Sequence, residues 1–263
     1  MEKNKQDAAK SFCDLLDVVQ ELRQKCPWDR KQTNESLRKN TIEETFELSE
    51  ALLNDDIPNI KKELGDVLLH VLFYSIIANE KSQFDISDVC NSLREKLIFR
   101  HPHIYGEVKA DTAHAVEQNW EQIKLKEKGG NKRVLDGVPS HLPSLIKAER
   151  IQEKAANYGF DWADKKDVWA KVREEVMEFA DELETGNDET QTEEFGDILF
   201  SLVNAARLYH IDVDTALERT NRKFITRFNY IEDKAAEINV PLKTMTLEQM
   251  DSLWDEAKQQ EQK

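Results

Sequence analysis

One acidic pattern occurs twice in the chain at a constant separation of 131 residues (175 minus 44), and this repeat constrains the fold more than any other feature. The first copy is Glu43-Glu44-Thr45-Phe46-Glu47 with Glu63-Leu64-Gly65-Asp66, and the second is Glu174-Glu175-Val176-Met177-Glu178 with Glu194-Phe195-Gly196-Asp197. Residues three apart share one face of a helix. Each copy therefore predicts two helices, each with a pair of carboxylates on one face.

Residues with a preference for turns separate the two acidic segments of each copy. Residues 54–58 read Asn-Asp-Asp-Ile-Pro, and residues 185–188 read Thr-Gly-Asn-Asp. The spacing from Glu47 to Glu63 equals that from Glu178 to Glu194. A short turn at each place predicts an antiparallel helical hairpin, which would bring the four carboxylates of each copy to one pocket.

The rest of the chain also reads as helix. It contains only 8 Gly and 6 Pro, and its apolar residues recur at three and four, so we expect an all-α fold built as a tandem duplicated helical bundle. The apolar stripe that includes Leu64, Val71 and Leu72 is predicted to lie at the centre of a bundle. The 263 residues suffice for two domains, which we place at 1–128 and 144–263, with a linker rich in Gly and Pro at 129–143.

Charge and cysteine content narrow the functional classes. The chain has 37 basic and 52 acidic residues, a formal charge of -15, which opposes binding to nucleic acid or to an anionic membrane. The most apolar stretch, residues 67–78, is too short to span a bilayer. The three cysteines form no CxxC pair, so a reducing cytoplasm is expected.

The converging carboxylates predict a metal site. Like charges a few ångströms apart repel each other, so such a cluster usually exists to hold a cation. Oxygen ligands alone favour Mg²⁺, with Mn²⁺ as a possible substitute. A solvated acidic face is the alternative, because 34% of the residues are charged, but repetition in register favours metal. The predicted ligands are Glu175, Glu178, Glu194 and Asp197, with a second set at Glu44, Glu47, Glu63 and Asp66.

Other residues near the repeats suit phosphate and base contacts. Lys223 and Arg227 lie one turn apart on a predicted helix and can bind phosphate oxygens. Trp254 is a candidate for stacking on a base, although a buried tryptophan is equally consistent. Gly65 and Gly196 lie inside the acidic motifs, where we expect the close approach of another helix more than access for a ligand.

The motifs together resemble a known family. Cys26-Pro27-Trp28-Asp29 precedes the first acidic repeat and Gly159-Phe160-Asp161-Trp162 precedes the second. From about residue 8 to residue 258, the chain is similar to the two-copy MazG nucleoside triphosphate pyrophosphohydrolases. The resemblance implies an all-α fold related to dimeric dUTPases, magnesium dependence and a homodimer. It also implies hydrolysis of nucleoside triphosphates, ATP included, and deoxynucleoside triphosphates to the monophosphate and pyrophosphate.

By position, the resemblance places nucleotide contacts at Lys171, Glu174, Glu193, Lys223, Arg227 and Trp254, and metal ligands at Glu175, Glu178, Glu194 and Asp197. It implies that the C-terminal copy is the main catalytic one. Either Glu174 or Glu178 could be the general base. The first half has Asn40 and Ile42 where the second has Lys171 and Arg173, so we expect it to lack the two cations beside its carboxylates and to be weakly active or regulatory.

Two other functions remain open. One is a regulatory module that binds metal and nucleotide without turnover. The other is a helical interaction protein with acidic hairpins, which leaves the repeated spacing unexplained.

Overall fold

The computed structural model describes residues 2–106, 112, 123 and 133–261, and every regular element in them is a helix. This confirms the predicted all-α fold. The chain forms two compact units, residues 1–120 and 121–263. The predicted domain boundary at residues 128 and 129 lies outside the described residues.

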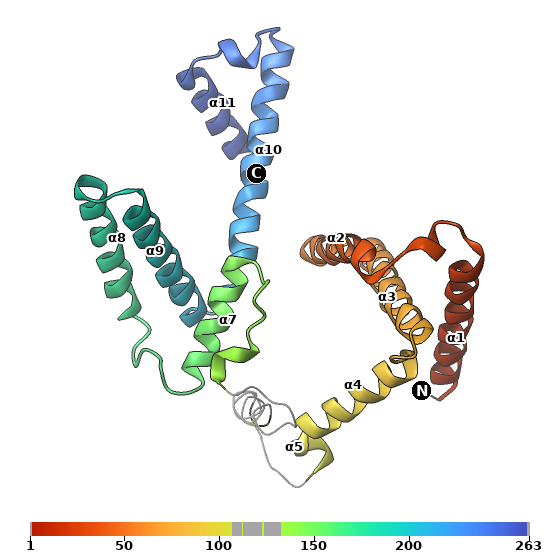
Figure 1. Ribbon diagram of the computed structural model, residues 1–263. Coiled ribbons are helices and arrows are strands. Elements are labelled where there is room, and N and C mark those ends of the chain that lie inside the picture. Colours follow the sequence, from red (N-terminus) through yellow and green to blue (C-terminus); the bar gives the residue numbers. More distant parts are fainter. Residues whose placement is uncertain (1, 107–111, 113–122, 124–132, 262–263) are drawn as a thin grey trace. The chain divides into compact units, whose positions relative to one another are not determined.

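The first unit contains α1 (Glu2–Lys25), α2 (Asn34–Leu53), α3 (Ile57–Glu80), α4 (Ile86–Arg100) and α5 (Pro102–Tyr105) (Figure 1). Helices α2 and α3 are the first predicted hairpin. Side chains cap both of their N-termini, because Thr33 accepts a hydrogen bond from the Ser36 amide and Asp56 from the Asn59 amide. The Arg23 guanidinium ties α1 to α3 through Glu80, with an Nε–Oε1 distance of 2.7 Å.

The core of this unit lies among α1, α2 and α3. Its buried side chains are Val19, Leu37, Leu72, Phe73 and Ile77. The predicted central stripe is only partly correct. Leu72 is fully buried, but Leu64 is 53% exposed and Val71 is 38% exposed. The apolar stripe of α3 is therefore wider than the surface that this unit buries by itself.

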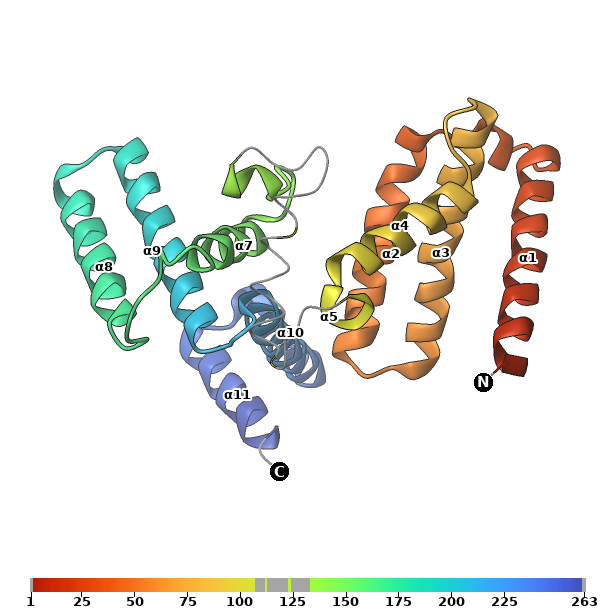
Figure 2. The same cartoon turned by 90° about the horizontal axis from the view of Figure 1, so that it is seen from below.

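The second unit contains α7 (Ser144–Ala156), α8 (Val168–Thr185), α9 (Asp188–Leu208), α10 (Val213–Glu237) and α11 (Leu247–Gln260). Helices α8 and α9 form the second predicted hairpin, and α7 crosses α9 (Figure 2). Val168, Val172 and Ala205 form its buried apolar cluster. In the described part of the chain, no helix combines the length and the apolar character that crossing a membrane requires.

Candidate metal and nucleotide site

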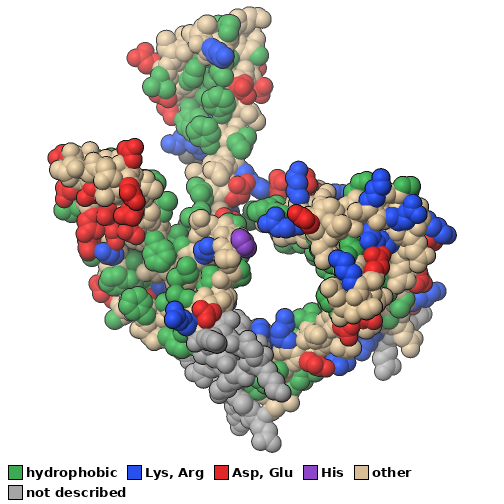
Figure 3. Space-filling model, in the orientation of Figure 1, with side chains coloured by type: hydrophobic (Ala, Val, Ile, Leu, Met, Phe, Trp, Pro, Cys, Tyr) green, Lys and Arg blue, Asp and Glu red, His purple; other side chains and the backbone are tan. Residues whose placement is uncertain are grey.

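The α8–α9 hairpin brings together three of the four carboxylates predicted in the second half. One carboxylate oxygen from each of Glu175, Glu194 and Asp197 lies within 4.8 Å of the other two. Glu175 is buried, Glu194 is half-buried and Asp197 is exposed. Figure 3 shows acidic side chains gathered on this hairpin. Three converging oxygen donors are a suitable ligand set for a hard divalent cation.

The electrostatics of this cluster agree with a cation site. Desolvation raises the pKa of the Glu194 carboxyl, and the charges of Asp197 and Glu175 raise it further. Carboxylates that share a small space destabilise one another's charged forms unless a cation compensates.

Glu178, the fourth predicted ligand, lies beside the three converging carboxylates but is not one of them. Its side chain is exposed. Desolvation raises the pKa of its carboxyl, Lys171 lowers it, and the neighbouring Glu175 and Glu174 raise it again. Glu178 is therefore close enough for the charges of the cluster to shift its pKa, although it is not one of the three converging carboxylates.

The Lys171 ammonium acts as a counterion to the cluster. Its Nζ lies 2.8 Å from a carboxylate oxygen of Glu174 and 2.8 Å from one of Glu175. These two hydrogen bonds are the main reason why the pKa of Lys171 is raised. Two predicted nucleotide contacts, Lys171 and Glu174, are thus joined to the carboxylate cluster, whereas the third on this hairpin, Glu193, is exposed on α9.

The first half repeats the arrangement on α2 and α3. Oxygens of Glu44, Glu63 and Asp66 lie within 4.8 Å of one another, and Glu47 is not part of this set. Desolvation raises the pKa of Glu44, as do the charges of Asp66 and Glu47. Glu63 is 4% exposed, and its Oε2 has no hydrogen-bond partner among the described residues. A buried carboxylate oxygen without a partner fits a cation ligand.

The expectation that the first half lacks a cation beside its carboxylates was wrong. Lys62 Nζ lies 2.8 Å from Glu63 and 3.9 Å from Asp66. At the separation of 131, Lys62 corresponds to Glu193, and Lys171 corresponds to Asn40. The cation therefore stands on the second helix of the first hairpin and on the first helix of the second. Matching residues by position concealed this exchange.

The remaining predicted nucleotide contacts form a separate group on α10 and α11. The Arg227 guanidinium carbon lies 5.3 Å from the centroid of the Trp254 ring, and its Nη2 lies 2.6 Å from Glu261. The hydrogen bond from Arg227 lowers the pKa of Glu261, and the charge of Lys223 lowers it further. Figure 1 shows α10–α11 and α8–α9 as distinct helix pairs. The structure thus gathers these three residues but does not bring them to the carboxylates.

The expectation that another helix of the same chain approaches Gly65 and Gly196 closely was also wrong. A side chain at Gly65 or Gly196 would meet nothing within 4 Å among the described residues. Neither glycine is explained by the close approach of another helix of the same chain. Both leave open space beside the carboxylates.

A pocket of about 660 Å³ adjoins the carboxylates of the second half. Lys171, Glu175 and Asp197 form part of its lining. Sequence reasoning did not identify three of its polar residues, Gln152, Asn204 and Arg207. A signal was present, because Asn204 and Arg207 correspond to Phe73 and Ile76 in the first half.

Comparison with known proteins agrees with this architecture. The model of the MazG nucleotide pyrophosphohydrolase domain matches the chain twice, at residues 32–105 and 164–231. Each match contains one acidic hairpin.

Relatives that align along almost the whole of this chain point to the same family. The chain is 42% identical to the nucleoside triphosphate pyrophosphohydrolase/pyrophosphatase MazG of Thermotoga maritima, over 94% of this chain and 95% of the relative. It is 37% identical to the nucleoside triphosphate pyrophosphohydrolase of Escherichia coli K12, over 94% of this chain and 97% of the relative. An uncharacterized Bacillus subtilis protein, YabN, is 46% identical over 96% of this chain and 52% of its own length. With two domain matches and relatives that align along almost the whole chain, the protein belongs to the MazG nucleotide pyrophosphohydrolase family.

Proposed function

We propose that this protein is a Mg²⁺-dependent nucleoside triphosphate pyrophosphohydrolase. It hydrolyses nucleoside and deoxynucleoside triphosphates, ATP among them, to the monophosphate and pyrophosphate. The observation that carries this proposal is the convergence of Glu175, Glu194 and Asp197 beside Lys171 at the edge of a large pocket. The names of the Thermotoga maritima and Escherichia coli relatives support the same reaction.

The carboxylates of both hairpins suit Mg²⁺, with Mn²⁺ as a substitute, because all their donor atoms are hard oxygens. Glu175, Glu178, Glu194 and Asp197 would hold the ion in the second half, and Glu44, Glu47, Glu63 and Asp66 would hold one in the first. When bound, the ion lowers the pKa of a water molecule and neutralises charge on the phosphates.

The chain's own residues then position the reactants. Lys171, once it leaves Glu175, can neutralise a phosphate oxygen, and its distance to both glutamates shows that it reaches the cluster. Glu174 and Glu178 are the candidates for the base that orients the attacking water, because both lie at the margin of the converging carboxylates.

We also propose a homodimer. Large apolar side chains remain exposed on the α8–α9 hairpin: Met177 is 68% exposed, Phe195 49% and Val176 48%. A partner protomer that covers them would supply the missing burial. The same association gives Lys223, Arg227 and Trp254 a route to a bound nucleotide, since within one chain they lie on a different helix pair. The three unpaired cysteines support a reducing, cytoplasmic location.

The runner-up is a regulatory module that holds metal and nucleotide without turnover. Incubation of the purified protein with Mg²⁺ and each common triphosphate separates the two functions, with pyrophosphate and orthophosphate measured separately. Pyrophosphate without orthophosphate is expected. If the protein binds nucleotide but releases no product from any of them, the regulatory module replaces the enzyme.

A matched pair of variants tests which half is catalytic. Glu194→Gln should reduce pyrophosphate release by roughly a hundredfold or more, because it weakens the cation site of the second half. Glu63→Gln, at the corresponding position, should retain most of the activity. Similar losses in the two variants would contradict the assignment of chemistry to the second half and of a weakly active or regulatory role to the first.

A further inference from the structure

The pocket beside the second carboxylate cluster has apolar walls and one polar edge. The walls include Ile151, Phe160, Trp162, Val168 and Phe200, and the edge is formed by Gln152, Asp161, Asn204 and Arg207. Because Lys171 and Glu175 line the same pocket, a molecule with its charged tail at the carboxylates can place a flat, largely apolar group inside it.

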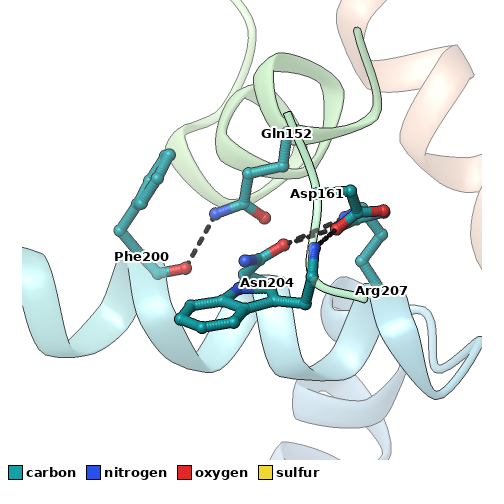
Figure 4. A network of polar contacts seen from close by, with 6 residues as sticks. Gln152, Asp161, Phe200, Asn204 and Arg207 are labelled. Carbon is teal, nitrogen blue, oxygen red and sulfur yellow. Dashed lines mark hydrogen bonds and ion pairs between the residues drawn. The ribbon is translucent and has the colours of Figure 1, made fainter. Parts of the chain in front are cut away.

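Gln152 presents a hydrogen-bond acceptor with a fixed orientation. Its Nε2 donates to the backbone carbonyl of Phe200 at 2.8 Å (Figure 4), which commits the nitrogen to α9. The residue is 6% exposed, and its Oε1 has no hydrogen-bond partner among the described residues. In Figure 4 this oxygen lies on the side of Asn204 and Asp161. A buried acceptor without a donor is unfavourable, so a donor from a ligand would be stabilising at this position.

Asn204 presents a hydrogen-bond donor instead of an acceptor. Arg207 donates to its Oδ1 from Nε at 3.0 Å and from Nη2 at 2.9 Å. This commits the oxygen of Asn204 to the guanidinium and leaves its amide nitrogen to serve as a donor. Arg207 is itself held by both carboxylate oxygens of Asp161, one of them 3.1 Å from Nη1 (Figure 4).

The Asp161 carboxyl group of this network is held in its ionised form. Burial acts to raise its pKa, but hydrogen bonds from Arg207 and from the Trp162 amide outweigh burial, so that the pKa of Asp161 is lowered. The carboxylate therefore stays ionised at neutral pH, and the orientation of Asn204 is maintained through Arg207.

The first half lacks this polar edge at the corresponding positions. The residues 131 positions before Gln152, Asn204 and Arg207 are Glu21, Phe73 and Ile76. Phe73 is 4% exposed and belongs to the apolar core, and Glu21 pairs with a lysine on the exposed side of α1. At the positions of Asn204 and Arg207, the first half thus has the hydrocarbon side chains of Phe73 and Ile76.

We propose that this pocket binds the nucleobase of the substrate and that Gln152 and Asn204 contact its Watson–Crick edge. The proposal rests on the proposed function, because the carboxylates must hold the triphosphate of the same molecule. Every common base carries an N–H donor beside an acceptor on that edge, which matches one fixed acceptor and one fixed donor. Phe160 is 85% exposed and Trp162 is 38% exposed, and both line the pocket, so both can rearrange around an entering base. The pocket would accept any common base but exclude one that is blocked at this edge.

Methylated uridine triphosphates test this directly. 3-Methyl-UTP lacks the N3–H donor, whereas 5-methyl-UTP carries its methyl group away from the edge. For the wild-type protein with Mg²⁺, we expect kcat/KM for pyrophosphate release to fall about 10- to 100-fold from UTP to 3-methyl-UTP, because the acceptor loses its donor. The value for 5-methyl-UTP should stay within about threefold of that for UTP. Equal rates for UTP and 3-methyl-UTP would overturn the proposal.

Two variants assign the discrimination to the named side chains. Gln152→Met removes the acceptor, and Asn204→Ala removes the donor without touching the ion pair between Asp161 and Arg207. In Gln152→Met the ratio of UTP to 3-methyl-UTP should approach one, mainly through KM for UTP, because N3–H has lost its acceptor. Asn204→Ala should raise KM for UTP and 3-methyl-UTP alike, because both keep the carbonyl oxygens that its amide would contact. Asn79→Ala, a similar change on the exposed surface of α3, should keep the wild-type ratio. If Gln152→Met keeps the wild-type ratio, or Asn204→Ala leaves KM unchanged, while the variant is folded by circular dichroism, the proposal is wrong.

Binding separates failure of the pocket from failure of the enzyme. Calorimetry with UMP and 3-methyl-UMP measures the same contrast without hydrolysis. Selective binding of UMP by a protein that releases no pyrophosphate would support the pocket and overturn the proposed function. Hydrolysis of both triphosphates at one rate would support the enzyme and overturn the pocket.

Discussion

The Lys171 ammonium occupies the carboxylates that a metal ion would need, so Lys171→Met should affect metal-free and metal-bound protein in opposite ways. In the metal-free protein, Lys171 makes two hydrogen bonds of 2.8 Å, to Glu174 and Glu175. A hydrogen bond between charged groups contributes about 1.5–3 kcal/mol when shielded from water. Because the lysine side chain is 39% exposed, screening reduces the pair together to about 1–2 kcal/mol.

This magnitude sets two expected results. With an unfolding entropy of about 2.1 cal/mol/K per residue, a unit of roughly 130 residues should lose about 4–7 °C in Tm when measured in chelator. Mg²⁺ no longer has to displace the ammonium, so the same free energy should tighten Mg²⁺ binding in the absence of nucleotide by about 5- to 30-fold.

The assays are thermal unfolding in chelator and calorimetric titration with Mg²⁺. Lys166→Met is the control, because Lys166 lies just before α8 and its side chain is exposed. It should change neither quantity. Weaker Mg²⁺ binding by Lys171→Met than by wild type would refute the argument, since Lys171 would then assist the metal site instead of competing with the ion.

Arg207→Met should lower the free energy of unfolding of the second unit by about 2–3 kcal/mol, because Asp161 and Asn204 lose their charged partner. Because the pKa of Asp161 is lowered, the ion pair stabilises the fold at pH values above the ordinary pKa of an aspartate. That stability is lost as the pH falls through the lowered pKa. The difference between wild type and Arg207→Met in urea unfolding should therefore shrink below about pH 4, and an undiminished difference would exclude this ion pair as its source. Leu72→Ala should cost the first unit about 2–5 kcal/mol, because Leu72 is fully buried, whereas Leu52→Ala, at a 57% exposed site, should cost less than about 0.5 kcal/mol. Equal costs in thermal unfolding would contradict the assigned core.

The hairpins were predictable from sequence because their determinants are local. Carboxylates three apart share a helix face whatever surrounds them, and turn residues between two such segments allow few alternatives. Both hairpins and the convergence of Glu44 with Glu63 follow from this spacing. The spacing could not predict which carboxylate would point inward, and Glu47 and Glu178 remain at the margins.

The features that escaped prediction depend on contacts between distant segments. The exposure of Leu64 and Val71 depends on what packs against α3, which a helical stripe cannot specify. The pocket edge joins α7 to α9 through the hydrogen bond from Gln152 to the carbonyl of Phe200, two residues that are 48 apart in the sequence. Side chains of this kind carry no periodic signal, and only their absence from the first half distinguishes them.

The different position of the lysine in the two hairpins affects how each hairpin could hold a polyphosphate. In the first hairpin the positive charge stands on α3, and in the second it stands on α8, the first helix of its pair. The electrostatic polarity across the two hairpins is therefore reversed. A polyphosphate that followed this polarity would lie in opposite directions in the two halves, so the duplicated units are not interchangeable even though their carboxylates are.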